Sequence, residues 1–166
     1  MSRRSIVSFF CAFTMLTFAT TAFAKDAAPA PSVNGVRFIN PSTLSAPTGY
    51  THVVEVPAAG KTLYISGQVA FNAKGELVGP NDFAAQAEQV FANLDAALKS
   101  ANATFANVVR LTIYVTDVSQ LKALRAARDK YVDLKHPPAS TLVEVSKLSR
   151  DGLLLEIEAI AVVPAP

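Results

Sequence analysis

Apolar residues recur every three or four positions between residues 79 and 101, which is the spacing of an amphipathic helix. The apolar face consists of Phe83, Ala87, Val90, Phe91, Leu94 and Leu98. Asn81 or Asp82 precedes this pattern, and either side chain can accept a hydrogen bond from the amides of the first turn. The segment is therefore predicted to form a long helix with one buried face.

A second helical pattern follows Asp117 or Ser119, and either residue suits the start of a helix. Pro137-Pro138 lies downstream of this pattern. Proline disfavours helical backbone in the residue before it and has no backbone donor. We therefore expect the two prolines to end this helix.

Alternating or β-branched runs predict the strands of the chain. These runs cover residues 52–56, 61–66, 108–115, 141–145 and 153–163, and a short strand at 36–39 would precede them. Residues 57–60 have the composition of a hairpin connection between the runs 52–56 and 61–66.

The resulting order, β-β-α-β-α-β-β, predicts an α+β domain with a mixed β-sheet and both helices packed on one face. Two helices cannot cover both faces of the sheet. Because large exposed apolar surfaces are uncommon on monomers, we expect the open face to be covered by oligomerisation.

Residues 1–24 have the features of a signal peptide: two early arginines, a mostly apolar stretch from 6 to 18, and Ala22-Phe23-Ala24 before Lys25. A membrane-spanning helix needs roughly 20 apolar residues, and this stretch is shorter. We expect cleavage after Ala24, which gives a periplasmic or secreted protein without a membrane contact. A membrane anchor is the alternative. The arginines suit both the general secretory and the twin-arginine route.

Removal of the signal peptide changes the composition that bears on function. Residues 25–35, rich in alanine and proline, are expected to form a flexible lead, and 36–166 have the size of a single domain. Cys11, the only cysteine, is removed, which excludes cysteine chemistry. Loss of two arginines leaves 13 basic and 13 acidic residues, and such neutrality argues against a nucleic-acid-binding protein. His52 and His136 are isolated from each other, so neither a metal site nor a histidine-based triad is expected.

Several blocks of sequence, in order, are similar to those of the RidA (YjgF) family of reactive imine and enamine deaminases. They are Gly49-Tyr50-Thr51-His52, Ser66-Gly67-Gln68, the run 108–117, Pro138-Ala139-Ser140-Thr141 and Glu156-Ile157-Glu158-Ala159. The resemblance covers nearly all of the mature chain. It implies a chorismate mutase-like fold, a homotrimer whose sheets form a central barrel, and small-molecule clefts between subunits.

The resemblance also implies an activity, the hydrolysis of a small imine or enamine to a keto acid and ammonia without a cofactor. The family's Pro-Ala-Arg-Ser signature supplies an arginine at the position that Ser140 occupies in this chain. An arginine holds a substrate carboxylate with two charge-assisted hydrogen bonds. A serine offers one neutral hydrogen bond, so another cation would be needed for a carboxylate-bearing imine.

Arg128 is our candidate for that cation. Helical spacing groups it with Leu121, Leu124 and Tyr131, which places the guanidinium among apolar residues. In the alternative interpretation, Arg128 covers apolar surface with its methylenes and reaches water with its charged end. Arg110, on the polar face of its strand, is a weaker candidate.

The resemblance places Glu156 in the cleft, where it would handle protons. Alternation along the strand puts Glu156 and Glu158 on one face, and Glu158 is expected to be solvated or paired with a cation. Ser66 precedes Gly67 at a strand end, where a backbone amide can approach a ligand closely. The predicted substrate-binding residues are Arg128, Tyr50, Ser66, Gly67 and Ser140.

Three functions fit this sequence to different degrees. The first is hydrolytic deamination of small reactive imines or enamines, with a substrate preference altered by Ser140. The second is a trimeric small-molecule binding protein that keeps the cleft without catalysis. The third, a ribonuclease or translation inhibitor as ascribed to some relatives, fits poorly with export and a neutral mature chain.

Overall fold

The computed structural model describes residues 32–33, 35–57 and 60–165, so the predicted signal peptide and most of the predicted flexible lead lie outside the described residues. The strands are β1 (Ser32–Val33), β2 (Val36–Ile39), β3 (Val53–Glu55), β4 (Lys61–Gln68), β5 (Val108–Val115), β6 (Ala139–Glu144) and β7 (Leu155–Val163). The helices are α1 (Phe83–Ser100) and α2 (Leu121–Arg128), with 3₁₀ turns at Phe105–Asn107 and Val118–Gln120.

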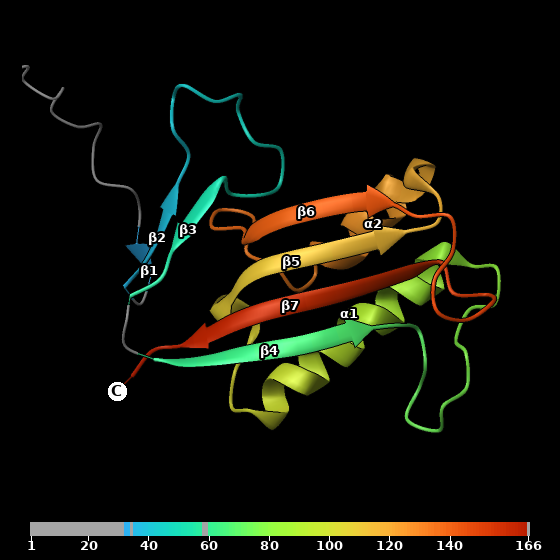
Figure 1. Cartoon of the computed structure of the whole chain (residues 1–166). Coiled ribbons are helices and arrows are strands. Elements are labelled where there is room, and N and C mark those ends of the chain that lie inside the picture. Colours follow the sequence, from blue (N-terminus) through green and yellow to red (C-terminus); the bar gives the residue numbers. More distant parts are fainter. Residues whose placement is uncertain (1–31, 34, 58–59, 166) are drawn as a thin grey trace, which may run out of the picture.

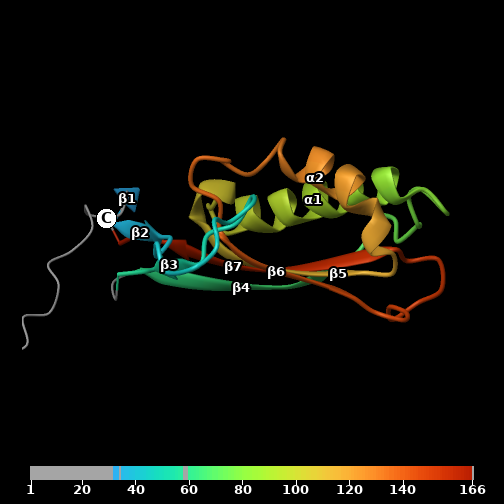
Figure 2. The same ribbon diagram turned by 90° about the horizontal axis from the view of Figure 1, so that it is seen from above.

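The main sheet has four strands in the order β4-β7-β5-β6 (Figure 1). β5 and β6 run parallel, whereas β7 is antiparallel to both β4 and β5. Both helices cover the same face of this sheet, and the opposite face carries no helix (Figure 2). The predicted α+β architecture, with a mixed sheet and two helices on one face, is confirmed.

Helix α1 follows the predicted apolar pattern. Of the two candidate caps, Asp82 is the N-cap, and its side chain accepts a hydrogen bond from the Ala85 amide at 3.0 Å. The cap satisfies an amide that has no partner within the helix. Beyond Ala101, Asn102 adopts a positive φ of 56°, which ends the helical backbone.

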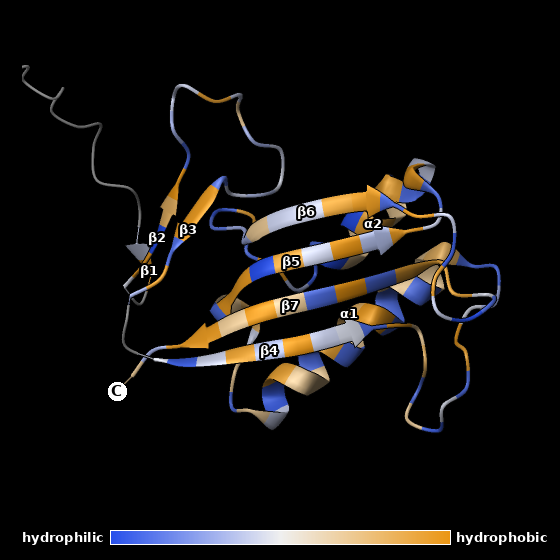
Figure 3. Ribbon diagram, in the orientation of Figure 1, coloured by the Kyte–Doolittle hydropathy of each residue, from blue (hydrophilic) through white to orange (hydrophobic). Residues whose placement is uncertain are grey.

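The core lies between the helices and the inner face of the main sheet. Its fully buried members include Val90, Phe91, Leu94 and Leu98 of α1, and Leu155, Ile157 and Ala161 of β7. Polar and apolar residues alternate along most of β5 and along the first half of β7 (Figure 3). Because successive side chains of a strand point to opposite faces, the polar residues between these core positions lie on the open face.

Gln86 is the buried polar residue of α1. Its amide donates to the carbonyls of Gly79 at 3.1 Å and Gly152 at 2.7 Å, and it accepts from the Leu154 amide at 2.9 Å. A buried amide is tolerated when its hydrogen bonds are satisfied. Gln86 thus fastens the start of α1 to the turn before β7.

Helix α2 is shorter than predicted. It ends at Arg128, nine residues before Pro137, so the prediction that Pro137-Pro138 end it is wrong. Asp133 stabilises a turn instead, because its carboxylate accepts from His136 Nδ1 and from the Lys135 amide, both at 2.9 Å. The hydrogen bond from His136 and that from Lys135 lower the pKa of Asp133. The prolines are buried at the entrance to β6.

The predicted hairpin between the runs 52–56 and 61–66 is also wrong. β3 pairs with β2 in a separate three-stranded sheet, whereas β4 pairs with β7. Arg37 lies opposite Glu55 in that pairing and forms an ion pair with it at 2.7 Å. The partner of β3 is β2, the short strand that was predicted at residues 36–39.

Candidate functional site

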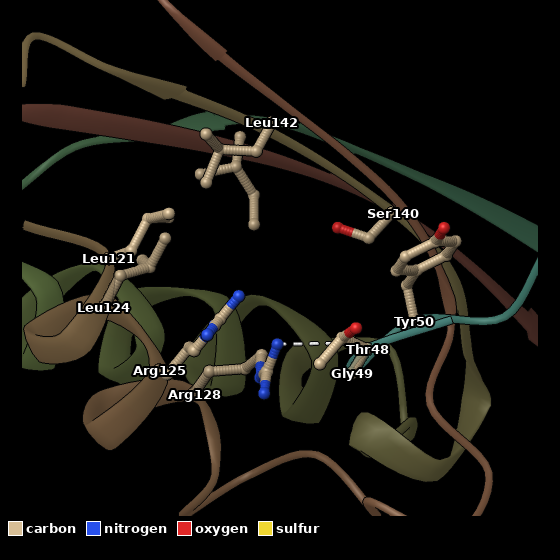
Figure 4. A pocket seen from close by; sticks show the side chains of 10 residues that line it. Thr48, Gly49, Tyr50, Leu121, Leu124, Arg125, Arg128, Ser140 and Leu142 are labelled. Atoms are coloured by element: carbon tan, nitrogen blue, oxygen red, sulfur yellow. Dashed lines mark hydrogen bonds between the residues drawn. The ribbon is translucent and has the colours of Figure 1, made fainter. Parts of the chain in front are cut away.

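A cavity of about 350 Å³ lies between α2 and the strands β5 and β6 (Figure 4). Its lining consists of Thr48, Gly49, Tyr50, Ile113, Leu121, Leu124, Arg125, Arg128, Ser140 and Leu142. Cavities of this size accept small organic molecules. Three of the predicted site residues, Tyr50, Arg128 and Ser140, therefore share one pocket.

The strand wall of the cavity follows from the register of β5 and β6. Ser140 pairs with Leu111, and Leu142 pairs with Ile113. Leu111 and Ile113 point to the helix-covered face, where they are 1% and 4% exposed. Paired residues on neighbouring strands share a face. Ser140 and Leu142 therefore face α2.

The helix wall comes from residues spaced three or four apart on α2. Leu121, Leu124, Arg125 and Arg128 all line the cavity. Such residues lie on one helix face, with side chains inclined toward the preceding turn. The wall consequently combines two apolar side chains with two guanidinium groups.

Arg128 is held by the protein itself. Its Nε and Nη2 atoms lie 2.8 Å and 2.7 Å from Asp129 Oδ1, and its Nη1 atom donates to the Gly49 carbonyl at 3.1 Å. Its side chain is 15% exposed. The snorkelling interpretation, with the charged end in bulk water, does not describe this geometry.

Gly49 makes the contact with Arg128 sterically feasible. Its φ is +78°, and an added methyl group would lie 2.9 Å from both terminal nitrogens of Arg128. Positive φ and close approach are both tolerated best by glycine. Tyr50 follows directly, and its ring makes an edge contact with the His52 ring at a centroid distance of 5.2 Å.

Thr51 fastens this loop to the start of β6. Its hydroxyl donates to the Pro137 carbonyl at 2.6 Å, and its amide donates to the Pro138 carbonyl at 3.2 Å. Thr51 is 2% exposed. Residues 48–50 are therefore positioned from both sides, by Thr51 along the chain and by Arg128 across the cavity.

Three other predicted site residues, Glu156, Ser66 and Gly67, do not line this pocket. Glu156 stands between Leu155 and Ile157, which are fully buried beneath the helices, so it points to the open face. Gly67 lies against it, and a methyl group at Gly67 would overlap the Glu156 carboxylate. Within one chain, the predicted site residues are thus divided between the two faces of the sheet.

A second hollow, of about 400 Å³, lies on the open face and contains Ser66. Arg110, Thr112 and Glu158 also line it. Arg110, the weaker candidate cation, does not line the pocket that contains Arg128, but it lies along a groove with Tyr50 and Ser140 at the start of β6. Glu144, at the end of β6, accepts a hydrogen bond from the Val118 amide at 2.7 Å, which is a structural contact.

Arg125 is the functional candidate that the sequence reasoning missed. No hydrogen bond or ion pair joins its side chain to another described residue, and its guanidinium points from α2 into the pocket (Figure 4). Its position three residues before Arg128 and four after Leu121 was the available signal.

Within the described residues, no three His, Cys, Asp or Glu side chains gather in a group able to bind a metal ion. The helices of the same part of the chain are all too short or too polar to cross a membrane.

Residues 40–163 match the sequence profile of a family described as endoribonuclease L-PSP. The chain belongs to the RidA/YjgF/L-PSP family. The match spans β3 to β7, both helices and both hollows described above.

Two members of this family match most of this chain and most of their own length. A RutC family protein of Synechocystis is 33% identical over 131 residues, which are 78% of this chain and 98% of that protein. A 2-iminobutanoate/2-iminopropanoate deaminase of Bos taurus is 34% identical over 122 residues, which are 73% of this chain and 87% of that protein.

Solved RidA/YjgF structures have the same fold. The Rid family protein YyfB from Yersinia pestis, described as of unknown function, is 43% identical with a TM-score of 0.68 and covers 77% of this chain and 98% of its own. RidA from an Antarctic Psychrobacter is 31% identical with a TM-score of 0.57 and covers 76% of this chain and 99% of its own.

Proposed function

We propose that this protein hydrolyses small imines or enamines to the corresponding carbonyl compound and ammonia, with a substrate preference that differs from that of relatives with the signature arginine. The observation that carries the proposal is the pocket that Arg125 and Arg128 of α2 line together with Ser140 of β6. It occurs in a chain of the same family as the 2-iminobutanoate/2-iminopropanoate deaminases of Bos taurus and Capra hircus.

We also propose that this chain belongs to a subgroup of the family in which a serine, here Ser140, replaces the arginine of Pro-Ala-Arg-Ser. The loss of that arginine removes a bidentate partner for a substrate carboxylate. The guanidinium groups of α2 supply positive charge on the opposite wall of the same pocket. In this proposal, the cation that binds an anionic imine belongs to helix α2 instead of strand β6.

Hydrolysis of an imine also needs a group that handles the protons of water. The water oxygen bonds to the imine carbon while a carboxylate accepts one water proton and passes it to the nitrogen, which gives a carbinolamine. The carboxylate then accepts the hydroxyl proton and passes it to the nitrogen as the C–N bond breaks, so that ammonia and the carbonyl compound are released. Glu156 is the proposed carboxylate. Because it lies across the sheet from Ser140 within one chain, we propose that a neighbouring copy of a homotrimer supplies it.

Export is part of the same proposal. Cleavage after Ala24 would place a neutral protein outside the cytoplasm, where it would meet small reactive metabolites rather than nucleic acid.

Release of ammonia and keto acid from freshly generated 2-aminoacrylate tests the proposal directly. We expect turnover by the native protein and a loss of about 100-fold or more in Glu156→Gln, which keeps the shape but cannot accept a proton. Glu158→Gln, two residues along the same strand face, is the matched control and should retain activity. Imines without a carboxylate should be assayed in parallel, to define the preference.

The second candidate is a binding protein that has kept the pocket without catalysis. One observation favours it: none of the described residues lining the pocket is acidic. Absence of turnover with every imine, together with saturable binding of a keto acid, would establish this alternative and overturn hydrolysis.

A further inference from the structure

The two arginines of the pocket differ in whether their guanidinium groups already have partners within the protein. Arg128 already has Asp129 as a charge partner and the Gly49 carbonyl as an acceptor. A guanidinium that is neutralised and held on two sides can offer little further attraction to an anion. Its geometry instead fixes the position of the loop that carries Tyr50.

Arg125 lies one helical turn earlier and has no such partner among the described residues. Its guanidinium points into the space between the leucines of α2 and Ser140, whereas Arg128 turns toward Gly49 (Figure 4). All five N–H donors of Arg125 are available to a ligand.

The rest of the lining defines the kind of ligand that would fit. Four aliphatic side chains form one part of the pocket: Ile113, Leu121, Leu124 and Leu142. Thr48, Tyr50 and Ser140 add neutral polar groups near its other end. One free cation beside an aliphatic wall suits a molecule with one carboxylate and a short hydrocarbon chain.

We propose that Arg125 contacts the carboxylate of the ligand, that Arg128 is a positioning residue for the Gly49-Tyr50 segment, and that the ligand is an aliphatic monocarboxylate. This inference rests on the proposed function only in taking the α2–β6 pocket as the ligand site. It differs from the expectation that Arg128 itself replaces the signature arginine as the ligand contact.

The test compares two stable probes, 4-methyl-2-oxopentanoate and its neutral carboxamide, whose dissociation constants are measured by NMR titration. Arg125→Gln should weaken the carboxylate about fivefold to tenfold, the range for a charge-assisted hydrogen bond in a partly exposed site. The same variant should leave the carboxamide unchanged. Lys122→Gln removes an equal charge from exposed α2 surface outside the pocket lining and should change neither.

Arg128→Gln should weaken both probes to a similar extent, because it releases the loop rather than removing a ligand contact. Arg128→Lys, which can still donate to Gly49 and pair with Asp129, should recover most of the affinity for both. This recovery separates a positioning role from direct charge recognition.

Unchanged carboxylate binding in Arg125→Gln, or a carboxylate-selective loss in Arg128→Gln, would overturn the inference. Failure of the native protein to bind either probe would overturn it as well. Selective binding through Arg125 without any imine turnover would support the inference while removing the proposed hydrolysis, so the two failures are distinguishable.

Discussion

At the scale of single residues, Gly49 has two separate reasons to lack a side chain. Its backbone has a φ of +78°, and its α-carbon faces the guanidinium of Arg128. We expect Gly49→Ala to lower the free energy of unfolding by about 1–2 kcal/mol, the usual cost of a left-handed L-residue. It should also displace Arg128 and weaken keto-acid binding, as measured by urea unfolding and NMR titration.

Gly75 provides the matched control for this prediction. It has the same φ of +78°, but an added methyl group there would have no neighbour within 4 Å. Gly75→Ala should therefore show the backbone cost alone and leave ligand binding intact. Equal binding by both variants would contradict a role for the Gly49–Arg128 contact.

The candidate site was predictable only in part because residue identity does not specify which strands lie side by side. Tyr50, Arg128 and Ser140 line one pocket; Tyr50 and Ser140 belong to recognisable blocks, and helical spacing singled out Arg128. Whether Glu156 and Ser140 share a face of the sheet depends on the register of β7, β5 and β6. Alternation along a strand shows only which residues of that one strand point to the same side. Arg125 was missed because an exposed arginine on a helix usually indicates a solvated surface.

At the scale of elements, local patterns predicted where strands and helices form better than which strands pair with one another. The alternation that defines β5 and β7 is a property of a few successive residues, and it was confirmed. The pairing of β3 with β2 depends on the return of an intervening loop, residues 40–52. Such non-local pairing leaves no periodic signal in the sequence.

Thr51 is the residue by which this loop is joined to β6. Thr51→Val preserves shape but leaves the buried Pro137 carbonyl without its hydroxyl donor. We expect the free energy of unfolding to fall by about 1–2 kcal/mol, the cost of such an unsatisfied acceptor. Urea unfolding measures this change, and Thr43→Val, at an exposed position of the same loop, should leave stability within error. Equal stability of the two variants would show that the Thr51 hydrogen bond does not anchor the loop.

At the scale of the whole molecule, the helix-free face of the main sheet is less apolar than the sequence pattern suggested. Charged residues Arg110 and Glu158 lie there with Thr112 and Ser66. Tyr64, on the same face, is 81% exposed, an unusual state for a large aromatic side chain on a regular strand. Such a mixture of aromatic and charged groups resembles the composition of protein interfaces.

We therefore expect the mature protein to form a homotrimer through this face, with roughly three times the protomer mass in light scattering coupled to size-exclusion chromatography. Tyr64→Glu introduces a carboxylate close to Glu158 and should shift the population toward monomers, because like charges at an interface repel and lose solvation. Ala126→Glu adds the same charge to an exposed position of α2 and should leave the mass unchanged. If Tyr64→Glu remains trimeric, the subunits associate through another surface. A monomeric native protein would remove the neighbouring copy that the proposed reaction needs, since Glu156 and the α2 pocket lie on opposite faces of one chain.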